Sequence, residues 1–208
     1  MVRGSFALPV MVFTPTSPTD AELRATLSQA RVAYEQETTT QSPPILTENL
    51  DAETLWEAEN RLLERVPAHV SEHGCIEDRE LLENVVLWKF GPGVGMIRDV
   101  PPADVAAVTR RALQSDTAPA AIEILGELDG IADSMAGAVL TFVNPQRYTV
   151  MDPRATRALS DLGFWALDHA ANADQYETYC LRCQELGNRT GLSLRDVDRA
   201  LFVLGGED

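Results

Sequence analysis

Apolar residues recur three and four positions apart through most of the chain, which is the spacing of one face of an α-helix. Between residues 51 and 66, for example, Leu55, Leu62 and Val66 fall on one such face. Asp, Ser and Pro residues at the starts of apolar segments mark where helices begin. We predict helices over residues 20–36, 51–66, 78–90, 102–114, 119–127, 133–144, 153–162, 174–188 and 193–204. The predicted fold class is therefore all-α.

The expected organisation is an irregular N-terminal segment with one helix over residues 1–50, followed by a helical domain over 51–208. A chain of 208 residues, 45 % of them hydrophobic, is long enough to bury a core without disulfides or metal. No apolar run approaches the roughly 20 residues that a membrane helix needs, so we expect no membrane partner. A short apolar stretch near the N-terminus is interrupted by Pro9 and does not resemble an export signal. We therefore expect a cytoplasmic protein.

The charged residues are strongly biased. Acidic residues number 32 against 17 basic ones, and the basic residues are 16 arginines and a single lysine, Lys89. An excess of carboxylates with almost no lysine resembles proteins of salt-loving organisms, so we expect a halophilic protein. The alternative is an acidic protein of ordinary habitat whose charge of −15 repels nucleic acid at low salt. In about 1 M salt the screening length falls to about 3 Å, so net charge excludes no partner there.

Cysteine and histidine suggest no metal site. Three cysteines are an odd number and too few for a secreted disulfide framework, which favours a reducing compartment. Cys180 and Cys183 lie on one predicted helix, and we interpret both as residues of the core or its boundary. His69, His73 and Cys75 have ligand chemistry on an expected loop, but a fourth ligand is missing.

Residues 128–154 have the most informative pattern. Leu128-Asp129-Gly130-Ile131-Ala132 links two apolar helices, and Gly130 permits a tight turn between them, so residues 119–144 are predicted to form a helical hairpin. The loop at 145–153 then reads as an extended piece that delivers Asp152 to the start of a new helix, the first of the C-terminal helices over 154–204.

From Leu128 to Asp152 the chain resembles, without a gap, the helix-hairpin-helix (HhH-GPD) DNA glycosylases, in particular endonuclease III and the adenine glycosylases. The shared pattern is a Leu-x-Gly turn, a helix of small residues, a Pro-containing loop, and an Asp before an Arg-bearing helix. The resemblance implies two helical subdomains around a cleft that faces DNA. In such a cleft a base is flipped out of the duplex and its N-glycosidic bond is cut.

The resemblance assigns the catalytic role to Asp152. A carboxylate there can stabilise positive charge on the sugar or activate the attacking water. The alternative is that Asp152 only caps the helix that begins at Pro153, and the two roles are compatible. Bifunctional members form a Schiff base on a lysine whose position is taken here by Ser134, and no lysine lies nearby, since Lys89 ends an earlier helix. We therefore expect a monofunctional enzyme without lyase activity, with Ser134 in its site.

The expected DNA contacts lie in the hairpin and around Asp152. In the family the hairpin amides contact a DNA phosphate, sometimes through a monovalent cation, and Gly130, Ile131 and Ala132 occupy those positions. Asp129 and Ala132 replace the usual Pro and second Gly, and Asp133 adds a carboxylate, which opposes phosphate binding unless a cation intervenes. Apart from that cation no cofactor is expected.

Three arginines surround the aspartate and give residues 144–159 a net charge of +2. They either hold a phosphate backbone or pair with neighbouring carboxylates, and they are Arg147, Arg154 and Arg157. A stacking pocket for the base would draw on tryptophan, although tryptophans more often fill the core. The candidates are Trp56, Trp88 and Trp165.

Two functions follow as expectations. The first is a DNA-binding protein of the base-excision-repair type, a monofunctional DNA N-glycosylase. The alternative is a non-catalytic DNA-binding or protein-interaction module that retains the glycosylase scaffold. The lesion and the oligomeric state are left open by the sequence.

Overall fold

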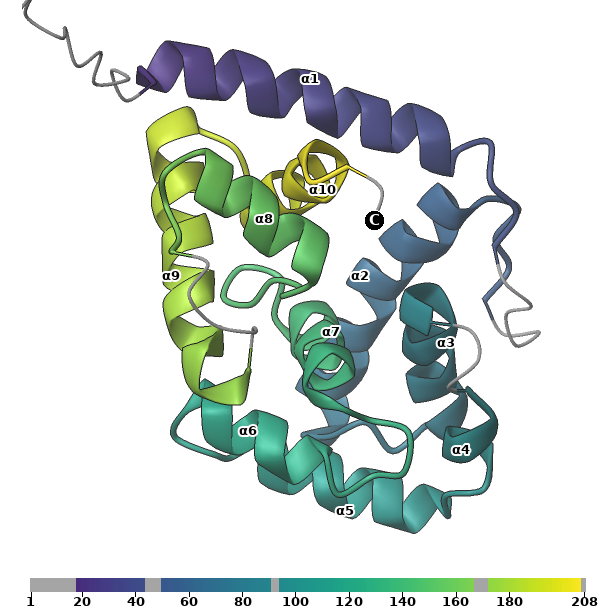
Figure 1. Cartoon of the computed structure of the whole chain (residues 1–208). Helices are drawn as coiled ribbons and strands as arrows, with labels where there is room; N and C mark the ends of the chain where they lie inside the picture. Colours follow the sequence, from purple (N-terminus) through teal and green to yellow (C-terminus); the bar gives the residue numbers. More distant parts are fainter. Residues whose placement is uncertain (1–17, 44–49, 91–93, 167–171, 207–208) are drawn as a thin grey trace, which may run out of the picture.

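The computed structural model describes residues 18–43, 50–90, 94–166 and 172–206, and within these ranges every regular element is a helix (Figure 1). This confirms the all-α prediction. The helices are α1 (Asp20–Thr38), α2 (Leu55–His73), α3 (Arg79–Phe90), α4 (Val94–Arg98), α5 (Pro102–Leu113), α6 (Ala118–Leu125), α7 (Asp133–Val143), α8 (Pro153–Asp161), α9 (Ala173–Thr190) and α10 (Leu194–Leu204).

Most helices lie within a few residues of their predicted ranges, and the two largest differences are in α2 and α4. Helix α2 continues past Val66 to His73, with Pro67 inside it, so His69 and His73 lie on a helix and not on a loop. A proline in a helix removes one hydrogen bond, but buried Val66 and Val70, which packs against the core, hold the helix on both sides of it. The short helix α4 was not predicted. The preceding glycine-rich residues 91–93 lie outside the described residues.

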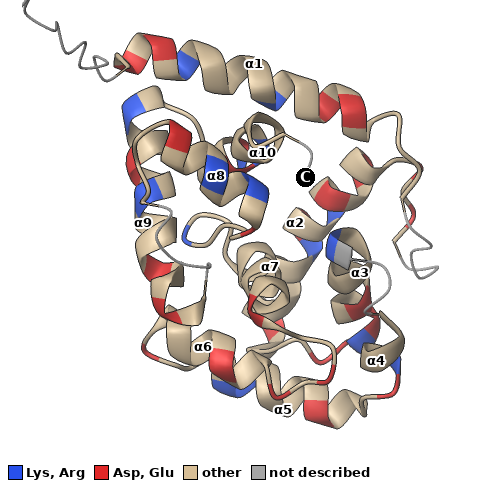
Figure 2. Ribbon diagram, in the orientation of Figure 1, with Lys and Arg blue, Asp and Glu red and all other residues tan. Residues whose placement is uncertain are grey.

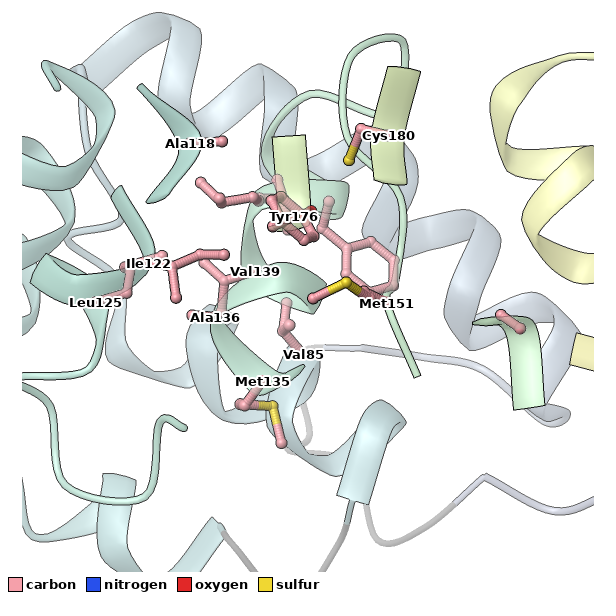
Figure 3. Packing of buried hydrophobic residues seen from close by; sticks show 14 of the residues in the cluster. Val85, Ala118, Ile122, Leu125, Met135, Ala136, Val139, Met151, Tyr176 and Cys180 are labelled. Atoms are coloured by element: carbon pink, nitrogen blue, oxygen red, sulfur yellow. The ribbon is translucent and has the colours of Figure 1, made fainter. Parts of the chain in front are cut away.

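The hydrophobic core draws on helices from both ends of the chain. Figure 3 shows Ile122 and Leu125 of α6 close to Val139 of α7, with Tyr176 of α9 beside them. Helix α1 packs along α10 (Figure 1), and its buried residue Leu27 belongs to the same core cluster. The helix expected within an irregular N-terminal segment thus packs with the helices of residues 51–208. In the described part of the chain, no helix combines the length and apolarity that crossing a bilayer requires.

Charged side chains are buried where α1, α2 and α10 meet. Glu59 of α2 is fully buried and accepts hydrogen bonds from Arg195 at 3.0 Å and from Arg199 at 2.7 Å. The Tyr34 hydroxyl of α1 donates to its other oxygen at 2.5 Å. Burial alone would raise the pKa of Glu59, but the two arginines outweigh it and hold that pKa below its ordinary value. This buried cluster fixes α10 against α1 and α2.

Candidate functional site

An extended segment between α7 and α8 is held by hydroxyl groups from two helices. Tyr176 donates to the Thr149 carbonyl at 2.9 Å, and Tyr179 donates to the Val150 carbonyl at 3.2 Å. Ser134 donates to the Met151 carbonyl at 3.3 Å. Three consecutive carbonyl groups are therefore bound by side chains, which gives this buried segment one fixed path toward the next residue, the candidate aspartate.

Asp152 ends that segment and begins α8. Its Oδ1 accepts a hydrogen bond from the backbone N–H of Ala155 at 2.9 Å, which is the geometry of a helix cap. Its Oδ2 lies 3.2 Å from Nζ of Lys89, at the end of α3. The Asp152 side chain is 10 % exposed and the Lys89 side chain 18 %. One carboxylate oxygen of Asp152 therefore caps α8, and the other is paired with Lys89.

The partner of Asp152 corrects the sequence analysis. Lys89, the only lysine in the chain, was expected to lie away from the aspartate because it ends an earlier helix. That expectation was wrong: the two residues are 63 positions apart and form an ion pair. The physical reason is the packing of α3 against α7, which brings the end of α3 to the segment that precedes α8.

Both residues line a cavity of about 170 Å³ between α1, α3, α8 and α10. Its charged lining residues include Lys89, Asp152, Arg154, Arg195, Asp198 and Arg199. Glu37 and Thr38 of α1, and Gln41 after the end of α1, also line the cavity. Cavities of about 150 Å³ accommodate a benzene ring, so this one has room for a six-membered ring.

Arg154 is the arginine of the cavity whose charge is least compensated. Its guanidinium lies over the ring of Phe202, with Cζ 3.8 Å from the ring centroid. Its Nε is buried without a hydrogen-bond acceptor, and it makes no ion pair with any residue in the described ranges. Arg195 and Arg199, by contrast, are both paired with Glu59. Arg154 therefore offers a guanidinium group to an anionic ligand.

The other two predicted arginines lie outside the cavity lining. Arg157 donates to the Gly205 carbonyl at 3.0 Å, which ties α8 to the end of α10. Arg147 stacks on the ring of its neighbour Tyr148 at 5.0 Å. Figure 2 shows basic residues on α8, whereas acidic residues are spread over α1, α2, α5 and α6. Of the predicted basic cluster, only Arg154 joins Asp152 in the cavity.

Asp198 adds a second buried carboxyl group to the cavity. It is 2 % exposed and forms an ion pair with Arg195. Burial raises its pKa to about 6; the positive charge of Arg195 opposes this shift, and the nearby charge of Asp152 adds to it. Two buried carboxyl groups, Asp152 and Asp198, thus line the cavity together with Glu37.

Among the residues described, the turn between α6 and α7 contributes no lining residue to this cavity. Gly130 has a φ of +88°, which favours glycine, and the N–H of buried Ile131 donates to the Leu128 carbonyl at 3.0 Å. Ala132, at the start of α7, supplies no side-chain cap. Asp133 accepts a hydrogen bond from the N–H of Ala173 at 3.3 Å, so one of the two unfavourable carboxylates helps to begin α9.

Ser134 is likewise absent from the cavity lining in the described part of the chain. Its hydroxyl supports the Met151 carbonyl, so it acts on the position of Asp152 through the backbone. Among the predicted tryptophans, Trp88 lines the cavity, with the Arg195 guanidinium 5.1 Å from its ring centroid. Trp165 packs edge-on against Tyr179 instead.

Within the described residues, the cysteines and histidines that the sequence analysis named take structural positions. Cys180 and Cys183 are buried in the hydrophobic core, as predicted, and burial raises the pKa of Cys180 to about 12. His69 accepts a hydrogen bond from the Glu77 N–H at 3.3 Å, and His73 lies 3.1 Å from the Glu77 carboxylate. Within the described ranges, no three potential ligands are grouped so that they could hold a metal ion.

Several lining residues were missed by the sequence analysis. Arg195, Asp198 and Arg199 recur three and four positions apart on the last helix, and this spacing of charges on one face could have identified them. Nothing in the local pattern of Tyr34 distinguishes it from a core residue. No family model, no curated protein and no solved structure matches the chain. The interpretation of this cavity as a candidate site therefore depends on its geometry alone.

Proposed function

We propose that this chain is a DNA-binding N-glycosylase in which Asp152 is the catalytic carboxylate. The observation that supports this most is that Asp152, although it caps α8, lines a cavity large enough for one aromatic ring. A capping residue without another role would need no such cavity. The proposal includes the finer fold assignment: the cavity is the cleft between two helical subdomains of the helix-hairpin-helix glycosylase type.

In this proposal each side of the cavity has its own task. The Asp152 carboxylate stabilises the positive charge that develops on the sugar as the glycosidic bond breaks, or activates the attacking water. Trp88 lines the cavity and offers an aromatic ring against which a flipped base stacks, while the ring of Phe202 supports the Arg154 guanidinium. Arg154 binds a phosphate next to the flipped nucleotide.

The hairpin serves as a second DNA contact in the proposal. The amides of Gly130 and Ala132 approach a phosphate, as in the family that the segment resembles, whereas the Ile131 N–H already donates to the Leu128 carbonyl. Asp129 and Asp133 are exposed beside them, so a monovalent cation bridges the hairpin and the phosphate. Binding is then expected to need potassium or sodium, and Ser134 contributes by holding the Met151–Asp152 backbone.

The test is base excision in molar potassium salt. Duplexes that each carry one damaged or mispaired base are incubated with the protein, and abasic sites are then cleaved with alkali. Asp152→Asn should lower the rate about a hundredfold or more, since a catalytic carboxylate is lost. Asn caps a helix as well as Asp does, so α8 should remain intact. Asp161→Asn, at the exposed end of the same helix, is the matched control and should excise like wild type.

The alternative is a non-catalytic DNA-binding or protein-interaction module, and the exposed carboxylates of the hairpin favour it. Asp129 and Asp133 flank the turn, and Glu127 beside them is also exposed. A module of this kind would bind a duplex or a basic protein surface without releasing a base. Retention of labelled duplex in molar potassium salt, with no alkali-sensitive site on any lesion, would establish it over the enzyme.

A further inference from the structure

Arg154 is the one cation of the cavity lining that has no partner among the described residues. Each of the other three lining cations faces a carboxylate: Lys89 pairs with Asp152, and the two arginines of α10 pair with Glu59. The Arg154 guanidinium makes no hydrogen bond and no ion pair with any described residue. One positive charge of the cavity is therefore left for a ligand to balance.

The ring of Phe202 holds this guanidinium in place. Arg154 Cζ lies 3.8 Å from the ring centroid, a cation–π contact that restricts the side chain without using its N–H donors as hydrogen bonds. A guanidinium binds a planar carboxylate through two parallel N–H groups. An arginine that is already positioned loses less conformational freedom when it makes such a pair. Arg154 is therefore suited to bind a carboxylate.

The apolar part of the lining favours a flat ring. Leu55, Trp88 and Val150 line the same cavity. Its volume of about 170 Å³ is slightly larger than the roughly 150 Å³ that accommodates benzene, so one six-membered ring and a small substituent fit. A terminal phosphate group is larger than a carboxylate and carries about two negative charges at neutral pH, whereas one cation here is unpaired. A ring with a single carboxylate matches both the volume and the charge.

The acidic residues of the lining do not close the cavity to an anion. The two buried ones, Asp152 and Asp198, each form an ion pair with a cation. Glu37 is exposed, and its carboxylate accepts a hydrogen bond from Gln41 at 2.9 Å. Charges in contact with water interact weakly with their neighbours, so Glu37 repels a bound anion only slightly.

We propose that this cavity binds a planar aromatic monocarboxylate, with its carboxylate on Arg154 and its ring against Trp88. Binding of such a molecule requires neither DNA nor base excision, and in this it goes beyond the proposed function. The ring occupies the room that the proposed function gives to a flipped base. Where both hold, the small molecule competes with the base and inhibits excision.

Benzoate is the probe, and the controls are benzamide, its neutral isostere, and acetate, the same anionic group without the ring. Each is titrated into the full wild-type chain by isothermal calorimetry. Because chloride competes for a guanidinium, potassium chloride is kept at the lowest concentration at which the protein stays folded. We expect benzoate to bind at least about tenfold more tightly than either control, since one control lacks the charge and the other the apolar ring. No binding of benzoate, or equal affinity for benzoate and either control, overturns the proposal.

Two variants test the role of the guanidinium. Arg154→Met removes it and keeps a long side chain over Phe202, and it should lower the affinity for benzoate at least about tenfold. Arg182→Met is the matched control, because it removes an exposed arginine of α9 that is paired with Glu185. It should bind benzoate like wild type. Thermal unfolding establishes that both variants are folded. If Arg154→Met binds as tightly as wild type, or if both variants lose the same affinity, the proposal is overturned.

The indole N–H signals in the NMR spectrum of the wild-type protein locate the ligand. Trp88 lines the cavity, whereas Trp165 packs edge-on against Tyr179. Benzoate should shift the Trp88 signal and leave the Trp165 signal in place. A Trp88 signal that does not move at saturating benzoate places the ligand elsewhere and overturns the proposal.

The excision assay separates failure of this proposal from failure of the glycosylase proposal. Excision by a protein that does not bind benzoate overturns the carboxylate site and leaves the glycosylase proposal standing. Benzoate binding that depends on Arg154, in a protein that excises no base, supports the carboxylate site and counts against the glycosylase proposal alone. When both activities are present, saturating benzoate should inhibit excision.

Discussion

Lys89 and Asp152 stand 63 residues apart in the sequence, yet their charged groups are 3.2 Å apart at the edge of a cavity. Removal of the lysine leaves a carboxylate that is 10 % exposed without its cation. We expect Lys89→Met, which keeps a side chain of similar length, to lower the free energy of unfolding by about 2 kcal/mol. Urea denaturation measures this change. In the double variant Lys89→Met/Asp152→Asn most of this loss of stability should disappear. If the double variant instead loses the sum of what the two single variants lose, the ion pair contributes nothing to stability.

The capping role of Asp152 predicts a difference between two substitutions at one position. Asp152→Ala removes the acceptor of the Ala155 N–H, whereas Asp152→Asn keeps it. We expect the alanine variant to be less stable than the asparagine variant by about 1 kcal/mol. Equal stability of the two variants in urea denaturation would show that the 2.9 Å contact does not stabilise α8.

The tyrosine that holds the Thr149 carbonyl should matter for stability. Tyr176 is fully buried and packs on Gly137, where an added Cβ would stand 3.0 Å from the ring. Tyr176→Phe leaves the Thr149 and Gly137 carbonyls without this donor, and we expect a loss of about 1–2 kcal/mol. Tyr148→Phe removes a half-buried hydroxyl and is the matched control. The proposal of a fixed segment fails if both variants melt at the same temperature.

Asp198 predicts an uncommon dependence of stability on pH. Its pKa is raised to about 6 in the folded state, from an ordinary value of 3.8. The folded protein therefore holds this proton more tightly than the unfolded chain, and the resulting stabilisation is complete below about pH 4 and is lost as pH rises through 6. Paired carboxylates such as Glu59, whose pKa is lowered, change stability in the opposite direction.

The comparison of Asp198→Asn with wild type isolates this contribution. Both proteins share every other titrating group, so the difference between their melting temperatures reports on Asp198. We expect the melting temperature of the asparagine variant to rise relative to that of the wild type between pH 4 and pH 7. Thermal unfolding across this range measures the difference, and a difference that stays constant with pH would contradict the raised pKa.

The helical periodicity made most of the fold predictable, and exceptions had local causes. Helix α2 was predicted to end at Val66, but it continues to His73, because packing on both sides of Pro67 outweighs the hydrogen bond that this proline removes. The sequence also predicted that Asp152 can cap the helix that begins at Pro153, because an Asp before a Pro marks a helix start, and the structure shows this cap. The contact between Lys89 and Asp152 was not predicted from the sequence. A contact between residues 63 positions apart depends on how helices pack and not on local spacing.

The other lining residues of the cavity could not be predicted from the sequence for the same reason. Arg195 and Asp198 carry charges that a solvated helix face would also carry, and only the packing of α10 against α1 and α2 makes them lining residues. Tyr34 has the spacing of a core residue and is one, yet its hydroxyl also binds Glu59. The hairpin, by contrast, was predictable because Gly130 is required by a local backbone angle.

The tethered backbone before α8 has a consequence for choice among ligands. The Thr149, Val150 and Met151 carbonyls each accept a hydrogen bond from a side-chain hydroxyl, so the backbone holds Asp152 in one position. A ligand must therefore adapt to the position of this carboxylate. Discrimination among ligands then depends on other lining residues, such as Glu37 of the first helix and Gln41 after its end. Substitutions of Glu37 and Gln41 should change which ligands bind, while the position of Asp152 stays the same.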